Sequence, residues 1–138
     1  MNIVIIDGQG GKLGRLLVES AVARFPEAKI TAVGTNTIAT AAMIKGGARR
    51  AATGENAVVV ACRSADFIIG PIGIVIADAL YGEITPKMAA AVGQSSATRI
   101  LLPMTTATHC ENIVAGLRDG LTIQELADDA IANLAASL

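Results

Sequence analysis

The sequence predicts an α/β protein built on an open, mostly parallel β-sheet with helices on both faces. Strand-like and helix-like segments alternate along the chain, which is the order that parallel sheets require. The strand-like segments are continuous apolar runs, as expected of strands covered on both faces. Glycine-rich turns follow three of these runs, and ligands bind to such sheets beyond the carboxyl ends of the strands.

The N-terminal segment predicts a strand followed by a helix. Residues 2–7 (NIVIID) form the first apolar run. Leu13, Leu17 and Ala21 then recur at helical spacing. Pro26 ends this helix because proline lacks the backbone N–H that a further turn would need.

The next segments repeat the order. Residues 29–33 (KITAV) predict the second strand, and residues 37–46 predict a helix that a glycine pair stops. Residues 55–63 (ENAVVVACR) fit either a buried helix or a strand. We predict a helix there, because the better strand, residues 66–70, follows directly and a parallel strand needs a crossover before it.

The C-terminal third predicts two helices and two strands. Residues 85–93 (TPKMAAAVG) combine a threonine cap, a proline at the first helical position and a final glycine, so they predict a helix. Residues 99–104 (RILLPM) and 112–117 (NIVAGL) predict strands. Thr122 and Glu125 have the spacing of a capping box, which predicts that an amphipathic helix closes the fold.

Length and composition bound the function. The 138 residues fit one domain over 1–138, with a formal net charge of −1 and 2% aromatic residues, so we expect no nucleic-acid partner. The longest apolar run, residues 67–80, is broken by Pro71 and Asp78 and is shorter than the ~20 residues of a membrane span. The two cysteines lack metal-site spacing, and no leader is recognisable. We therefore expect a cytoplasmic protein without a membrane span or metal.

The turn after the first strand has four glycines within seven positions. Its G-x-x-G-x-x-G spacing locally resembles the loop of dihydrodipicolinate reductase, and no P-loop pattern is present. Glycines permit tight turns, and a helix N-terminus offers an anion about half a positive charge. A tight turn without a ligand is the alternative. The predicted cofactor-binding residues of this loop are Gly8, Gln9, Gly10, Gly11, Lys12, Leu13 and Gly14.

Three charged residues flank this turn. Lys12 and Arg15 oppose the helix dipole unless a phosphate binds there, although both side chains can also extend into water. Asp7 would repel a phosphate, so it needs Lys12, a metal ion or backbone donors beside it. We favour the last, with Asp7 capping the turn through loop N–H groups.

Two further strand ends are predicted to meet the glycine loop. After the second strand there is no acid of the kind that binds a ribose in NAD sites. Thr35 and Asn36 stand there instead, and they either hold a 2′-phosphate or cap the next helix. The third turn contributes Gly70, Pro71 and Gly73. We expect all three turns to converge on one crevice.

Candidates for catalytic residues are few: Asp7, Glu83, His109 and Cys110. His109 adjoins Cys110, but neighbouring side chains diverge, so the pair does not predict a nucleophile with its base. A lone loop histidine is more often solvated. Glu83 either points into the crevice or is a solvated acid near a helix N-terminus.

Five motifs together carry a resemblance to a known family. In order they are "IDGQGG", "AVGTN", "ATGEN", "GPIG" and "GEITP". Their order and spacing, over residues 1–103, resemble a bacterial family of short proteins catalogued as a domain of unknown function. The resemblance implies a Rossmann-like fold and no established activity. The family tends to have Asn-x-Cys after the last of these strands, whereas this chain has Thr108-His109-Cys110.

These observations predict a nucleotide-binding protein whose cofactor is NADP or a related phosphorylated nucleotide. One hypothesis is a small oxidoreductase with a site shared between subunits, and the other is a non-catalytic sensor of a nucleotide or phosphometabolite. The mean hydropathy of +0.55 further predicts a dimer or larger assembly, because large apolar patches are rare on monomers.

Overall fold

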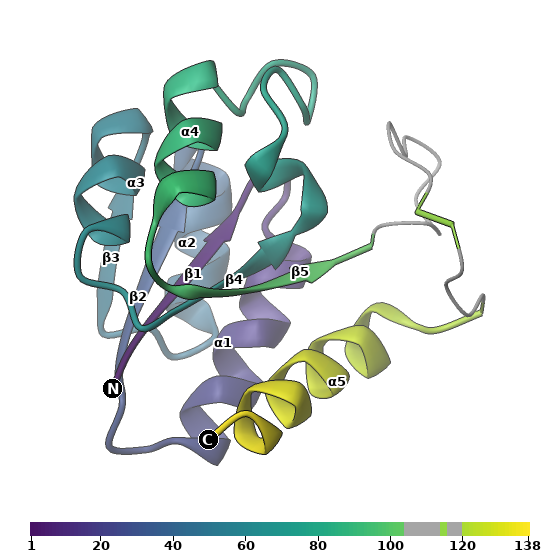
Figure 1. Ribbon diagram of the computed structural model, residues 1–138. Helices are drawn as coiled ribbons and strands as arrows, with labels where there is room; N and C mark the ends of the chain where they lie inside the picture. The colour runs from purple at the N-terminus through teal and green to yellow at the C-terminus, as the bar shows by residue number, and fades with distance from the viewer. Residues whose placement is uncertain (104–113, 116–119) are drawn as a thin grey trace.

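The computed structural model describes residues 1–103, 114–115 and 120–138 (Figure 1). Of the strand expected over residues 112–117, only Val114 and Ala115 are described, and neither lies in a strand. The rest of that segment lies outside the described residues.

Five parallel strands form one sheet, in the order β3-β2-β1-β4-β5. This confirms the α/β class and the open parallel sheet. The central strand β1 pairs with β2 on one side and β4 on the other, so that Ile5 lies between Ala32 and Ile69. The strands are β1 (Asn2–Asp7), β2 (Lys29–Gly34), β3 (Arg50–Thr53), β4 (Phe67–Pro71) and β5 (Thr98–Leu102).

The helices cover both faces of the sheet. They are α1 (Lys12–Arg24), α2 (Thr37–Lys45), α3 (Glu55–Cys62), α4 (Pro86–Gln94) and α5 (Ile123–Ala136). Helices α1, α2 and α5 lie on one face and α3 and α4 on the other (Figure 1). Their buried side chains form two apolar layers, one on each face. The expected helix over the ambiguous residues 55–63 is confirmed as α3. A short 3₁₀ helix, η1 (Ile72–Val75), was not expected.

The apolar run of β1 explains why the two layers hold together. Ile3 and Ile5 point into the layer of α1 and α5, whereas Val4 and Ile6 point into the layer of α3 and α4. All four are buried. Burying a side chain of this size stabilises the fold by about 1.5–3 kcal/mol, so this strand anchors both layers.

The strand order reverses between β1 and β4. The chain leaves β1 through α1 toward β2, whereas β4 continues through α4 to β5 on the opposite side. The loops that follow β1 and β4 therefore diverge, and a crevice beyond their carboxyl ends is the usual ligand position in such sheets.

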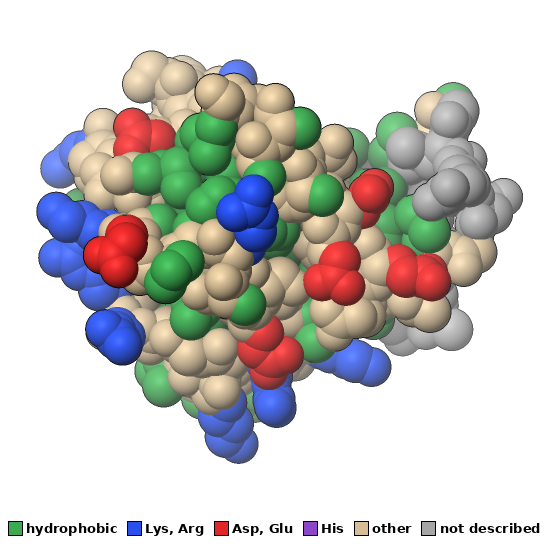
Figure 2. All heavy atoms as spheres, turned by 90° about the horizontal axis from the view of Figure 1, so that it is seen from below, with side chains coloured by type: hydrophobic (Ala, Val, Ile, Leu, Met, Phe, Trp, Pro, Cys, Tyr) green, Lys and Arg blue, Asp and Glu red, His purple; other side chains and the backbone are tan. Residues whose placement is uncertain are grey.

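The surface has mixed charge. In Figure 2, Lys and Arg side chains gather toward the left and lower rim of the face shown, Asp and Glu side chains are spread across it, and hydrophobic side chains lie between them. Among the described residues, no helix is both long and apolar enough to cross a membrane.

Candidate functional site

Asp7 ends β1 with its carboxylate turned into the glycine loop. Its Oδ1 accepts a hydrogen bond from the backbone N–H of Gly8 at 2.8 Å, and its Oδ2 accepts one from Gly14 at 2.7 Å. The residue is only 6% exposed. Burial raises the pKa of Asp7 to about 6, against the lowering effect of these two bonds and with a further rise from nearby Glu83. Asp7 thus caps the turn, which is the role that the sequence favoured.

Three of the loop glycines are explained by close packing of the chain on itself. Gly11 has φ +74°, and a Cβ there would lie 2.7 Å from Ala39 Cα on α2. A Cβ on Gly14 would lie 2.7 Å from Asp7 Cβ, and one on Gly8 would lie 2.7 Å from the Thr35 hydroxyl oxygen. Gly10 differs, because a Cβ there would meet open space. Only Gly10 leaves room for an incoming group.

Gly11, the N-cap residue of α1, has no side chain to cap the helix, and Asp7 accepts from the N–H of Gly14 in the first turn. Within the described part of the chain, the backbone N–H groups of Gly10, Lys12 and Leu13 have no hydrogen-bond acceptor. Gly10 and Lys12 are both exposed. Arg15 instead pairs with Glu19 one turn later, at 2.9 Å. The loop therefore presents unused donors beside the cation of Lys12.

Glu83 reaches from the segment between β4 and α4 to the loops that follow β1 and β2. Its Oε1 accepts hydrogen bonds from Gln9 N–H at 3.0 Å, the Thr35 hydroxyl at 2.8 Å and the Asn36 side-chain amide at 2.6 Å. We call these three donors the Glu83 cradle. Partial burial raises the pKa of Glu83, but the three hydrogen bonds outweigh it and leave this pKa below its ordinary value. The lowered pKa keeps the Glu83 carboxylate ionised at neutral pH.

Asn36 has two roles. Its Oδ1 accepts from Ala39 N–H at 2.8 Å and caps α2, while its Nδ2 donates to Glu83 and to the Gln9 carbonyl oxygen at 3.0 Å. Thr35 is tied to β1 by its backbone N–H, which donates to the Asp7 carbonyl oxygen at 3.0 Å. The capping role that the sequence allowed for Asn36 is therefore present, and it leaves the amide nitrogen to donate to Glu83.

The third glycine turn is closely packed against its own surroundings. A Cβ on Gly70 would collide with the carbonyl oxygen of Ile6, and one on Gly73 would lie 3.2 Å from Ala79 Cβ. Pro71 precedes the first turn of η1. These residues shape the start of the segment that carries Glu83; among the hydrogen bonds of the described residues, none joins them to the Glu83 cradle.

The remaining candidates contribute little to the described site. His109 and Cys110 lie outside the described residues. Cys62 on α3 is buried, and its burial raises the pKa of the thiol to about 11, which makes it unreactive. Groups of three or more potential metal ligands are absent from the described part of the chain.

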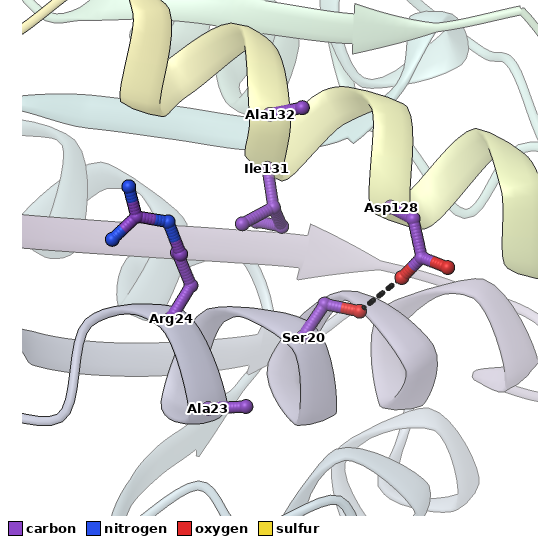
Figure 3. Close-up of a pocket in the computed structure, with 6 residues that line it drawn as sticks. All are labelled: Ser20, Ala23, Arg24, Asp128, Ile131 and Ala132. Atoms are coloured by element: carbon purple, nitrogen blue, oxygen red, sulfur yellow. Dashed lines mark hydrogen bonds between the residues drawn. The ribbon is translucent and has the colours of Figure 1, made fainter.

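A hollow of about 410 Å³ lies elsewhere, between α1 and α5 (Figure 3). The Ser20 hydroxyl and the Asp128 carboxylate point toward each other there and form a 2.8 Å hydrogen bond, with Arg24 at the side. Because Ser20 and Arg24 belong to the C-terminal half of α1, the hollow is remote from the free donors at its N-terminus. We assign the Ser20–Asp128 contact to the docking of α5.

The Glu83 cradle is the feature that sequence reasoning missed. Glu83 was considered for the crevice, but not as the partner of Gln9, Thr35 and Asn36. One signal was available: an acid is missing at the end of β2, and an acid stands in the segment after β4, beside the reversal of strand order.

Comparison with known proteins agrees with the fold. A family model described as "Domain of unknown function (DUF3842)" matches residues 2–138, so the match continues beyond residue 103 into the tail. No curated protein matches the chain. One similar solved structure is a dodecameric FMN-dependent UbiX-like decarboxylase from Escherichia coli O157:H7. It is 18% identical, with a TM-score of 0.52, and the match covers 99% of this chain and 94% of that one. At this identity the likeness concerns the fold alone.

Proposed function

Because the chain belongs to the DUF3842 family, described as a domain of unknown function, we propose its function from the site itself. The chain binds a phosphorylated nucleotide of the NADP or FMN class, with a phosphate at the N-terminus of α1. Asp7 and Glu83 border this position, and Lys12 supplies a cation to it.

One observation carries this proposal: the N–H groups of Gly10, Lys12 and Leu13 lack acceptors in the described structure. The N–H groups of Lys12 and Leu13 begin α1, where the peptide dipoles add about half a positive charge, and that of Gly10 lies just before it. They also lie at the reversal of strand order, the usual position of a nucleotide in such sheets. A phosphate oxygen is the acceptor that suits all three.

Asp7 does not compete for these donors. Its two carboxylate oxygens are already bound by Gly8 and Gly14, on the inner side of the loop. Its charge is therefore partly offset by donors of its own. The outer N–H groups and Lys12 remain available for a ligand.

Two nucleotides are supported by separate arguments. The similar decarboxylase is FMN-dependent by its title, and FMN has the terminal phosphate that suits a helix N-terminus. NADP is supported by the hydroxyl of Thr35 and the amide of Asn36, which are suitable donors for a 2′-phosphate.

Self-association also belongs to the proposal, since that decarboxylase is dodecameric and this chain is apolar on average.

The test compares Lys12→Gln with Lys87→Gln by isothermal titration calorimetry of NADP and FMN. Lys87 is the matched control, because it is an exposed lysine in the first turn of α4, whose N-terminus Thr85 already caps. Lys12→Gln should weaken the nucleotide that binds by about 1–2 kcal/mol, the scale of a lost charge-assisted hydrogen bond. Lys87→Gln should bind as the wild type does.

Equal affinities in both variants would remove the helix N-terminus from the site. Absorbance of bound nicotinamide or flavin, followed after adding candidate substrates, then separates the two functional classes. A spectral change with turnover indicates an oxidoreductase, whereas tight binding without turnover indicates a sensor.

A further inference from the structure

The Glu83 carboxylate occupies a position built for an anion. Three donors from two different loops converge on Oε1, namely Gln9 N–H, the Thr35 hydroxyl and the Asn36 amide. The Glu83 side chain comes from a third segment, 74 residues from Gln9 and 47 from Asn36. Such convergence on a single oxygen is unusual for an acid that merely faces solvent.

We infer that the Glu83 cradle is a second anion subsite, in which Glu83 holds the place of a ligand's phosphate or carboxylate until that group displaces it. The inference deepens the proposed function and rests on it for the identity of the ligand. The first subsite is the N-terminus of α1, and the second is the end of β2.

The chemistry of the donors supports this assignment. One backbone N–H, one hydroxyl and one primary amide are neutral donors, so the charges at this site are those of the Glu83 carboxylate and of nearby Asp7. Removal of the carboxylate leaves the Gln9 N–H, the Thr35 hydroxyl and one of the two Asn36 amide hydrogens without this acceptor, while the other amide hydrogen keeps its bond to the Gln9 carbonyl oxygen. An oxyanion restores all three hydrogen bonds, whereas water restores them without the charge-assisted strength.

Two links anchor the donors independently of Glu83. Asn36 is fixed by capping α2 through Ala39 N–H, and Thr35 is fixed by its backbone bond to Asp7. These two donors therefore remain in position when the carboxylate leaves. The segment around Glu83 is itself held by backbone hydrogen bonds, such as that from Asp78 N–H to the Ile84 carbonyl oxygen at 2.7 Å, so displacement calls for rotation of the Glu83 side chain alone.

The experiment empties the cradle and supplies an external anion. Inorganic phosphate is titrated into the wild type, Glu83→Ala and the control Glu27→Ala, at constant ionic strength, by calorimetry and thermal unfolding. Glu27 is exposed on the turn before β2, so its replacement removes the same charge away from the cradle. Glu83→Ala should bind phosphate at least tenfold more tightly than the wild type, and phosphate should raise its melting temperature more. Glu27→Ala should match the wild type.

Adding Thr35→Ala to Glu83→Ala should abolish the gain, because one of the three donors is lost. If Glu83→Ala unfolds, Glu83→Gln keeps the size of the side chain and should show a smaller gain for phosphate. An unchanged phosphate affinity in the folded Glu83 variants overturns the inference. A loss of nucleotide affinity without any phosphate gain also overturns it, and shows that Glu83 contacts the ligand directly.

These outcomes are separate from the test of the proposed function. Lys12→Gln acts at the N-terminus of α1, whereas Glu83→Ala acts at the end of β2. If Lys12→Gln leaves nucleotide binding unchanged while Glu83→Ala gains phosphate affinity, the cradle stands and the helix N-terminus does not. The reverse pattern keeps the proposed function and rejects the cradle.

Discussion

Two carboxylates, those of Asp7 and Glu83, lie at the carboxyl edge of the sheet. Their surroundings shift their pKa values in opposite directions. Asp7 is buried, and its pKa rises to about 6 although two N–H groups donate to it. Glu83 is more exposed, and its hydrogen bonds bring its pKa below the ordinary value. At neutral pH both are largely ionised, so each needs the donors that the loops provide.

The raised pKa of Asp7 predicts a specific pH dependence of stability. The folded state binds its proton more tightly than the unfolded state, so this contribution is fully present below pH ~4 and is lost as the pH rises through about 6. Lowering the pH from 7 to 5 should therefore raise the unfolding free energy of the wild type relative to Asp7→Asn by about 1 kcal/mol, since one pKa unit corresponds to ~1.4 kcal/mol. Urea denaturation at several pH values measures this difference.

Glu83 changes the pH dependence of the unfolding free energy with the opposite sign, because a lowered pKa stabilises the fold at higher pH. Glu83 is present in both the wild type and Asp7→Asn, so the difference between their unfolding free energies reports on Asp7. Asp129→Asn removes the same charge from an exposed position on α5 and controls for net charge. A difference that falls as the pH is lowered would contradict the raised pKa of Asp7.

The loop between β1 and α1 shows how far sequence predicts an element. The apolar run, the glycine turn and the helix that Pro26 ends are all present as expected. What the glycines contact could not be predicted, because Gly11 packs against Ala39 on α2 and Gly14 against Asp7 and Met43. These contacts depend on tertiary packing and not on local spacing.

Other elements show the same limit. The strand β3 was missed because its four residues are exposed and give no apolar pattern. The Glu83 cradle was missed because its hydrogen bonds join residues 47 to 74 positions apart. Helices with capping signals, such as those begun by Thr85 and Thr122, were predicted correctly because their signals are local.

A pair of glycine variants tests the packing account of this loop. Gly11→Ala should lower the free energy of unfolding by about 1–2 kcal/mol for the left-handed backbone, with a further ~1–3 kcal/mol from crowding against Ala39. Gly10→Ala is the control, since its Cβ meets open space and its φ is not positive. It should leave the stability unchanged or raise it by up to about 1 kcal/mol. Equal effects of the two variants in urea denaturation would mean that Gly11 is not held by packing.

At the scale of the molecule, the sheet order leaves β3 as an edge strand. All four of its residues are exposed, including Ala51 and Ala52. The two helices that contact β3 expose apolar side chains, namely Ile38 and Ile44 on α2 and Val60 on α3. An unpaired edge flanked by apolar side chains is a suitable surface for another strand.

We expect a second copy of this chain to pair with β3 about a twofold axis, which joins two five-stranded sheets into one. A symmetric antiparallel pairing centred between Ala51 and Ala52 places Arg50 opposite Thr53 of the second copy, so the arginines do not oppose each other. Light scattering should then give at least twice the 14.0 kDa of one chain at micromolar concentration.

The variant Ala51→Lys should shift the mass measured by light scattering toward that of one chain, because a lysine on an edge strand opposes pairing. Ala90→Lys, on the exposed side of α4, introduces the same charge away from β3 and should keep the assembly. A wild-type mass near that of a single chain would rule out self-association, and an assembly that Ala51→Lys leaves intact would place its interface away from β3.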